Sequence, residues 1–224
     1  ATNAAAFGYG AQATNTDTLA FGSNAQATGV SAFAFGQNSF ASNTNAMGLG
    51  VGSQATNADT LAFGSNAQAT GVSSFAFALN ALANATNAAA IGVGARATAA
   101  SATAFGANGQ ATAANTTAIG FNSLASNTNA TAFGSGARAT NTNAAAFGAN
   151  AQASSTNAIA IGAGARGAYT NAIALGSNAQ ATFGNATAIG LHAFANGASA
   201  TAIGVGAQAW NTNAIAIGSS AKAA

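Results

Sequence analysis

The sequence predicts an all-β fold, a parallel β-solenoid in which sixteen coils of 14 residues each carry two short strands. Three observations predict it: a 14-residue repeat that keeps its register without insertion or deletion, a glycine at one position of nearly every repeat, and runs in which small and large apolar residues alternate. Repeats built from helix pairs need about 33 residues or more, so this period suits one coil of a β-solenoid. We therefore expect a single repeat domain spanning 1–224.

The recurrent glycine sets the register of the repeat. In steps of fourteen from Gly8, fifteen of the sixteen positions are glycine, and only Ala78 departs. The residue before this position is always Phe, Ile or Leu, and the residue two before it is Ala except at Gly48. A disordered low-complexity segment has no reason to keep such a register. The chain is therefore expected to be folded throughout.

The residues ahead of the glycine predict the first strand of each coil. The segment 157–161 reads Asn-Ala-Ile-Ala-Ile and alternates with the period of two that a strand requires. Alternation places Ala158 and Ala160 on one face of the strand, and Ile159 and Ile161 on the other. Because a coil of 14 residues has room inside only for small side chains, the alanines are expected to point inward.

Asn, Asp or Ser begins this segment in every repeat. Identical amide side chains that recur from strand to strand can form hydrogen-bonded ladders. The asparagines of this column therefore predict an amide ladder that links each coil to the next. They are Asn3, Asn45, Asn87, Asn115, Asn129, Asn143, Asn157, Asn171, Asn185 and Asn213.

Each coil also needs two turns. Gly162 ends the first strand, and the position two residues further on is Gly or Asn in fourteen repeats, with His192 and Ser220 as the exceptions. Gly and Asn share a tolerance of positive φ, so this column predicts a left-handed turn residue. We expect residues 165–167 to begin the second strand, with Arg166 on its outer face, and a turn near 168–170 to close the coil.

The residue before the glycine column forms what we call the apolar ladder, on the outer face of the first strand. Each such side chain contributes roughly 1.5–3 kcal/mol when it is fully buried, and exposed apolar stripes of this size mark association surfaces. The sequence therefore predicts a homo-oligomer in which these side chains are buried between copies of the chain. The apolar ladder consists of Phe7, Phe21, Phe35, Leu49, Phe63, Phe77, Ile91, Phe105, Ile119, Phe133, Phe147, Ile161, Leu175, Ile189, Ile203 and Ile217.

Two further sets of large apolar residues are candidates for surface contact. The first, the flanking stripe, stands three residues before the glycine column in consecutive repeats: Leu19, Phe33, Met47, Leu61 and Phe75. The second replaces Gln on the polar face of the second strand, first at 42-residue spacing: Phe40, Leu82, Leu124 and Phe194. Either set could extend the interface between copies, bind a partner or serve lateral contact between molecules, and the sequence leaves these alternatives open.

Composition excludes several function classes. The chain has only four basic and two acidic residues, and it has no cysteine. Nucleic-acid binding needs clustered basic residues, and metal sites need grouped carboxylates, histidines or cysteines. The only histidine, His192, occupies a turn column, and no Ser or Asp is placed by motif to form a catalytic triad with it. We therefore expect no enzyme activity, no metal and no cofactor.

The segments 157–162, 171–176 and 213–218 read Asn-Ala-Ile-Ala-Ile/Leu-Gly. They resemble the head repeats of trimeric autotransporter adhesins, of which the Yersinia adhesin head is the type example, and the resemblance covers all sixteen repeats. It implies a left-handed parallel β-roll that trimerises and lies outside the bacterial outer membrane. The neck, heptad stalk and membrane anchor of that family have no counterpart in the sequence, so the resemblance implies anchoring through regions outside this chain.

The resemblance also implies a function. Heads of this family bind extracellular matrix proteins, cells or surfaces, and the segment from asparagine to glycine is linked there to collagen binding, which implies a contact at 157–162 and its equivalents. The leading hypothesis is an adhesive head or shaft of a bacterial surface fibre. The alternatives are a self-assembling extracellular filament, favoured by the low charge, and an ice-binding protein. Thr occupies the candidate ice-binding column in only eight of sixteen coils, which argues against a regular lattice match.

Overall fold

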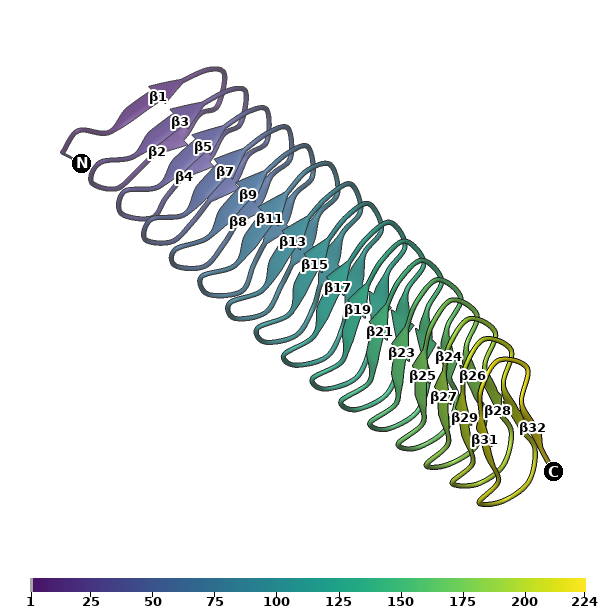
Figure 1. The fold of residues 1–224 in the computed structure, drawn as a ribbon. Helices are drawn as coiled ribbons and strands as arrows, with labels where there is room; N and C mark the ends of the chain where they lie inside the picture. The colour runs from purple at the N-terminus through teal and green to yellow at the C-terminus, as the bar shows by residue number, and fades with distance from the viewer. Residues whose placement is uncertain (1) are drawn as a thin grey trace. The chain divides into compact units, whose positions relative to one another are not determined.

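The computed structural model describes residues 2–224 as two compact units, 2–112 and 113–224, each built only of β-strands and turns (Figure 1). Within each unit the chain winds through eight coils, and each coil contributes one strand to each of two parallel sheets. The all-β parallel solenoid with two short strands per 14-residue coil is therefore confirmed. None of the described residues forms a helix long and apolar enough to cross a membrane.

The first unit carries strands β1 to β16. Its first sheet contains β1 (Ala5–Phe7), β3 (Leu19–Phe21), β5 (Phe33–Phe35), β7 (Met47–Leu49), β9 (Leu61–Phe63), β11 (Phe75–Phe77), β13 (Ala89–Ile91) and β15 (Thr103–Phe105). Its second sheet contains β2 (Gln12–Ala13), β4 (Gln26–Ala27), β6 (Phe40–Ala41), β8 (Gln54–Ala55), β10 (Gln68–Ala69), β12 (Leu82–Ala83), β14 (Arg96–Ala97) and β16 (Gln110–Ala111).

The second unit carries strands β17 to β32 in the same arrangement. Its first sheet contains β17 (Thr117–Ile119), β19 (Thr131–Phe133), β21 (Ala145–Phe147), β23 (Ile159–Ile161), β25 (Ile173–Leu175), β27 (Thr187–Ile189), β29 (Thr201–Ile203) and β31 (Ile215–Ile217). Its second sheet contains β18 (Leu124–Ala125), β20 (Arg138–Ala139), β22 (Gln152–Ala153), β24 (Arg166–Gly167), β26 (Gln180–Ala181), β28 (Phe194–Ala195), β30 (Gln208–Ala209) and β32 (Lys222–Ala223).

Strand pairing keeps each residue beside its equivalent in the next coil. In the first sheet Phe21 pairs with Phe35, and in the second sheet Ala27 pairs with Ala41, in each case at a separation of fourteen residues. The hydrogen bonding continues around the turns, where for example the Gly22 nitrogen donates to the Phe7 carbonyl at 2.8 Å. Every column of the repeat therefore becomes a row of stacked side chains within its unit.

Both turns of each coil have the same construction. In the first, the Ala25 nitrogen donates to the Gly22 carbonyl at 3.2 Å, and in the second, the Ala32 nitrogen donates to the Gly29 carbonyl at 3.3 Å. The third residue of each turn is left-handed, with φ of 55° at Asn24 and at Ser31, as a type II turn requires. The predicted left-handed column that contains Gly164 and His192 is confirmed, with φ of 67° and 56° at these two residues.

The predicted start of the first strand was wrong by two residues. Strand β23 begins at Ile159, and Asn157 is the left-handed third residue of the second turn, with φ of 57°. This turn, predicted near 168–170, spans Tyr169–Asn171 in its coil. The Asn, Asp or Ser column is therefore a second turn column, because these residues tolerate the left-handed conformation better than other non-glycine residues do.

The glycine column is required by stacking as well as by backbone conformation. Gly8 has φ of 131°, and a Cβ added to it would lie 2.6 Å from the carbonyl oxygen of Gly22 in the next coil. Most of the other glycines in this column meet the next coil in the same way. Ala78 adopts φ of 120° in this column and is its single non-glycine residue.

The core consists of alanine, as predicted. Every buried hydrophobic side chain in the described chain is an alanine, including Ala158 and Ala160 in the coil of β23. Polar residues inside the coils are the short Thr18, Thr60 and Thr116 and several serines. The Thr18 hydroxyl donates to the Asn15 carbonyl at 2.7 Å, so this buried donor is satisfied within its own turn.

Candidate interaction surfaces

The apolar ladder is the outermost row of the first sheet in both units. In every strand after β1 its side chain follows a buried small residue, which is alanine except for Gly48 in β7, so alternation points it away from the core. In the first unit, Phe21, Phe35 and Phe63 remain 46%, 49% and 44% exposed, and in the second unit Phe133 is 51% exposed. The outward direction predicted for this row is therefore confirmed. Five other ladder residues are half-buried: Leu49, Ile91, Ile119, Ile189 and Ile203.

Neighbouring rings of the ladder stack along it. The ring centroids of Phe21 and Phe35 lie 4.7 Å apart with an angle of 6° between the rings, and those of Phe63 and Phe77 lie 4.7 Å apart at 7°. In the second unit, Phe133 and Phe147 stack at 6.4 Å. Such stacking orders the rings but leaves their outer edges in water, so each unit presents a preformed apolar surface.

The flanking stripe runs beside the ladder in the first unit. Leu19, Phe33, Met47, Leu61 and Phe75 come from consecutive first-sheet strands, β3 to β11. Four of the five side chains are half-buried, and Phe33 is 39% exposed. The two rows touch where the rings of Phe75 and Phe77 lie 6.1 Å apart. The structure thus joins the ladder and the stripe into one broad apolar face in this unit.

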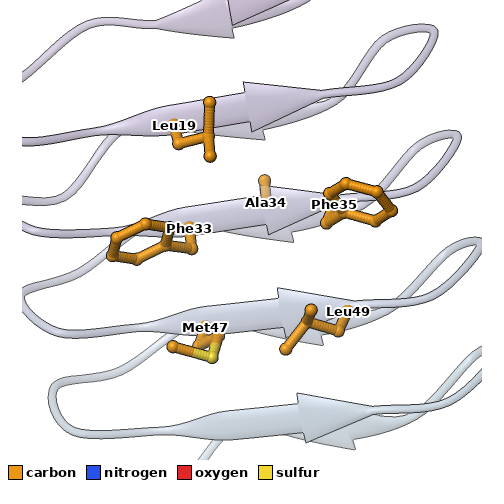
Figure 2. Close-up of a pocket in the computed structure, with 6 residues that line it drawn as sticks. All are labelled: Leu19, Phe33, Ala34, Phe35, Met47 and Leu49. Carbon is orange, nitrogen blue, oxygen red and sulfur yellow. The ribbon is translucent and has the colours of Figure 1, made fainter. Parts of the chain in front are cut away.

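A hollow of about 280 Å³ opens in this face (Figure 2). Figure 2 shows Leu19 and Phe33 on adjacent strands on one side, with Met47 on the next strand. The lining consists of Leu19, Phe33, Ala34, Phe35, Met47 and Leu49. Almost no polar surface lines it, so hydrocarbon or aromatic groups are its chemically matched occupants.

The second candidate set lies on the outer face of the second sheets. Phe40 pairs with Gln54, Leu82 with Arg96, and Leu124 with Arg138, and all three apolar side chains are half-buried. The Gln and Arg residues beside them on the adjacent strands have aliphatic stems long enough to cover part of an apolar neighbour, which agrees with this partial burial. The structure does not bring Phe40 and Leu82 together in the first unit, because two other coils separate them, and Leu124 belongs to the second unit. Phe194 differs, because its ring contacts Trp210.

The predicted amide ladder forms in the second unit. Asn115, Asn129, Asn143, Asn157 and Asn171 each donate from Nδ2 to Oδ1 of the asparagine in the next coil, at 3.0–3.3 Å, and the series ends at Asn185. In the first unit, Asn3 and Asn45 donate instead to Asp17 and Asp59 at 2.9 and 2.8 Å. The prediction was wrong for Asn87 and Asn213, which make no such bond among the described residues because serines interrupt the column.

Sequence reasoning missed one exposed row. The residue directly after the glycine column forms the tip of the first turn, where Tyr9 is 85% exposed and Phe121 is 55% exposed. The others in this row are Val51, Leu79, Val93, Leu191 and Val205. The signal was available, because position i+1 of a type II turn points to solvent whatever its polarity.

Neither the ladder nor the polar faces carry a metal site in the described chain. No three His, Asp, Glu or Cys residues between 2 and 224 lie close enough to hold a metal ion. His192 lies exposed in its turn, and the two carboxylates accept the hydrogen bonds from Asn3 and Asn45. Apart from four exposed basic residues on second-sheet strands, the surfaces available for recognition are made of apolar side chains, amides and hydroxyls.

Comparison with known proteins matches this chain to a family model. The model is described as the YadA head domain repeat (2 copies), and it matches residues 1–25, 13–39, 41–67, 55–77, 83–108, 111–137, 139–165, 170–193 and 195–221. None of the curated proteins shows a significant match. Among solved structures, the chain is similar to the collagen-binding domain of the Yersinia adhesin YadA, with 21% identity over 75% of this chain and 70% of that chain and a TM-score of 0.29.

Proposed function

Because this chain belongs to the family of YadA head domain repeats, we propose that it is the adhesive head of a fibre on a bacterial surface and that it acts as a homotrimer. The observation that carries the proposal is the match of the family repeat along nearly the whole chain. The broad apolar face of the first sheets supports the oligomer. An adhesin head exposes its outer faces to the environment, and the second sheets and the turns would supply the contacts with matrix, cells or surfaces.

The apolar ladder is the proposed interface between copies. Its side chains are exposed in the single chain, although each would contribute roughly 1.5–3 kcal/mol on full burial. Every coil therefore contributes burial free energy to association. Charge repulsion across the face is absent, because the ladder holds no ionisable residue. The flanking stripe widens the same interface in the first unit. By resemblance to the family, three copies would surround a common axis and bury these faces together.

Light scattering coupled to gel filtration tests the oligomer. The wild-type chain of 21.0 kDa should elute with three times its monomer mass. The double variant Phe21→Asp, Phe35→Asp places charges on the stacked part of the ladder without changing the alanine core, so its mass should fall to that of a monomer. The matched control is Val51→Asp, which changes a turn residue that is 50% exposed, similar to Phe35, and it should remain a trimer.

Adhesion is tested with beads that carry the oligomer. Beads are applied to collagen, fibronectin and bare polystyrene, and detachment is measured under flow. Binding to at least one coating above the level of uncoated beads supports an adhesive head. A stable wild-type monomer would overturn the oligomer, and absence of adhesion to all three surfaces would overturn the adhesive role. Indefinite threads in electron micrographs of the pure protein would favour the filament instead.

A further inference from the structure

Four aromatic side chains gather on one side of the second unit, and neither the apolar ladder nor the repeat pattern accounts for them. Tyr169 and Phe183 follow strands β24 and β26, Phe194 lies in β28, and Trp210 follows β30. These second-sheet strands lie in consecutive coils, and β24, β26 and β28 are seen together in Figure 1. We call these four residues the aromatic patch.

The patch is a departure from the surrounding repeats. The positions equivalent to Tyr169 in three preceding coils of the unit hold Asn127, Asn141 and Ser155. Those equivalent to Trp210 in the coils of β18, β20 and β22 hold Ser126, Thr140 and Ser154. Small polar residues are therefore sufficient to build these turns, and the large aromatic residues serve another purpose.

The first pair of rings forms a flat platform. Tyr169 and Phe183 stack with their ring centroids 5.7 Å apart and an angle of 8° between the rings, and they are 54% and 43% exposed. The face of Phe183 that is turned away from Tyr169 lies toward the next coil. There the equivalent residue is Gly197, which has no side chain to cover it. One aromatic face is thus open and backed by a second ring.

The second pair lies in the two coils that follow. Phe194 and Trp210 meet edge to face, with ring centroids 5.0 Å apart and an angle of 68°. Trp210 remains 43% exposed although an indole of its size is normally buried more deeply. The contact with Phe194 holds the indole in place and leaves much of its surface in water.

Neutral polar groups lie between the two pairs. The Thr182 hydroxyl donates to the Asn196 Oδ1 at 2.7 Å, and the Asn196 amide nitrogen donates to no group among the described residues. Gln180 and Gln208 flank Phe194 on the neighbouring strands. The two charged residues along this sheet stand at the ends of the patch, Arg166 beside Gln180 and Lys222 beside Gln208, and the second unit contains no carboxylate side chain. The patch therefore offers aromatic faces, amides and a hydroxyl with little charge.

We propose that the aromatic patch binds a neutral oligosaccharide, an assignment that rests on the proposed adhesive function and names a ligand class for it. A sugar ring presents a face of polarised C–H groups, which packs on the negative face of an aromatic ring. Its hydroxyls can bond to the amides of Asn196, Gln180 and Gln208. A purely hydrocarbon ligand would leave these amides unpaired. An anionic ligand needs a cluster of cations, whereas three second-sheet strands separate Arg166 on β24 from Lys222 on β32.

The single tryptophan makes this proposal directly measurable, because Trp210 is the only Trp in the chain. Cellohexaose, maltohexaose and chitohexaose are titrated into the wild-type protein while its tryptophan emission is recorded. At least one of them should shift the emission to shorter wavelength in a saturable manner, since a bound sugar excludes water from the indole. Phe183→Ala should weaken that binding roughly three- to tenfold, because it removes the stacking platform.

Two controls show whether sugar binding depends on the aromatic patch. Phe121→Ala removes an aromatic ring of similar exposure from a turn outside the patch and should leave the affinity unchanged, and calorimetric titration of every variant checks the fluorescence. The proposal is overturned if none of the three sugars binds at millimolar concentration, if Phe183→Ala binds as tightly as the wild type, or if hyaluronan hexasaccharide, which is anionic, binds more tightly than all three. An intact trimer that adheres to matrix but binds no sugar would overturn the sugar-binding proposal and leave the proposed adhesive function standing.

Discussion

The single alanine in the glycine column shows how strictly one position is determined by its backbone. Ala78 holds φ of 120°, a conformation that residues with a Cβ rarely adopt. The coil nevertheless keeps the hydrogen bond from the Ala78 nitrogen to the Phe63 carbonyl at 2.8 Å. The neighbouring coils therefore hold this residue in a strained conformation, at a cost of order 1–3 kcal/mol.

We expect Ala78→Gly to stabilise the protein by about 1–2 kcal/mol, because glycine adopts this φ without strain. Urea unfolding followed by circular dichroism measures the change. The reciprocal variant Gly64→Ala should destabilise the protein, since its Cβ would lie 2.6 Å from the Ala78 carbonyl carbon. Equal stability of Ala78→Gly and the wild type would show that the coil relaxes without strain.

At the scale of the structural element, the turns rather than the strands give the coil its shape. Each first-sheet strand has three residues and each second-sheet strand has two, whereas two left-handed residues per coil reverse the chain. Asn157 combines both roles of its column: it has φ of 57°, accepts from Asn143 at 3.1 Å and donates to Asn171 at 3.1 Å. Its conformation and its hydrogen bonds can be separated experimentally.

Two substitutions at Asn157 should differ in their cost. Asn157→Gly removes both side-chain hydrogen bonds but keeps the left-handed turn, and because these bonds are exposed we expect a loss of about 0.5–1 kcal/mol. Asn157→Ala adds the unfavourable left-handed conformation, roughly 1–2 kcal/mol more. Thermal or urea unfolding of the two variants gives the difference. A larger loss for the glycine variant would mean that the amide ladder, and not the turn, dominates.

The sequence predicts the fold well where residue type follows directly from geometry. The glycine column, the alanine core and the outward ladder could be predicted because each demands one kind of side chain. The Asn157 column was assigned to the start of the strand. Asparagine before an alternating segment is equally compatible with the first strand residue and with the left-handed residue of a preceding turn, and only the backbone φ distinguishes the two. Tyr169 and Phe183 are fourteen residues apart, so the register already placed them in adjacent coils, but the stacking of their rings depends on side-chain rotamers that the repeat pattern does not determine.

At the scale of the whole molecule, folding and association are expected to be coupled. The coils bury only alanines and small polar side chains, so the single chain gains little from its core compared with a domain that buries Leu, Ile and Phe. The apolar ladder holds the large side chains, and they are buried only when copies associate. Stability of the head should therefore depend on the oligomer.

We expect the apparent Tm to rise with protein concentration, as it does whenever unfolding includes dissociation. Differential scanning calorimetry over a hundredfold range of concentration measures this. Sodium chloride near 1 M should not lower the Tm, because the proposed interface contains no ion pair to screen. The monomeric variant Phe21→Asp, Phe35→Asp serves as the control and should melt at one temperature at all concentrations. A concentration-independent wild-type Tm would contradict the coupling.

The stacking of each coil directly on the next also bears on how such a gene changes. Because every coil offers its successor the same backbone surface, insertion or loss of whole coils leaves all remaining contacts intact, whereas a shift of one residue would disrupt every column. Residues 17–36 recur at 59–78 with only two differences, one of which turns Gly36 into Ala78. In-frame recombination between such copies would lengthen or shorten the protein while the contacts between coils stay the same. Alleles of this gene should therefore differ in length by multiples of fourteen codons.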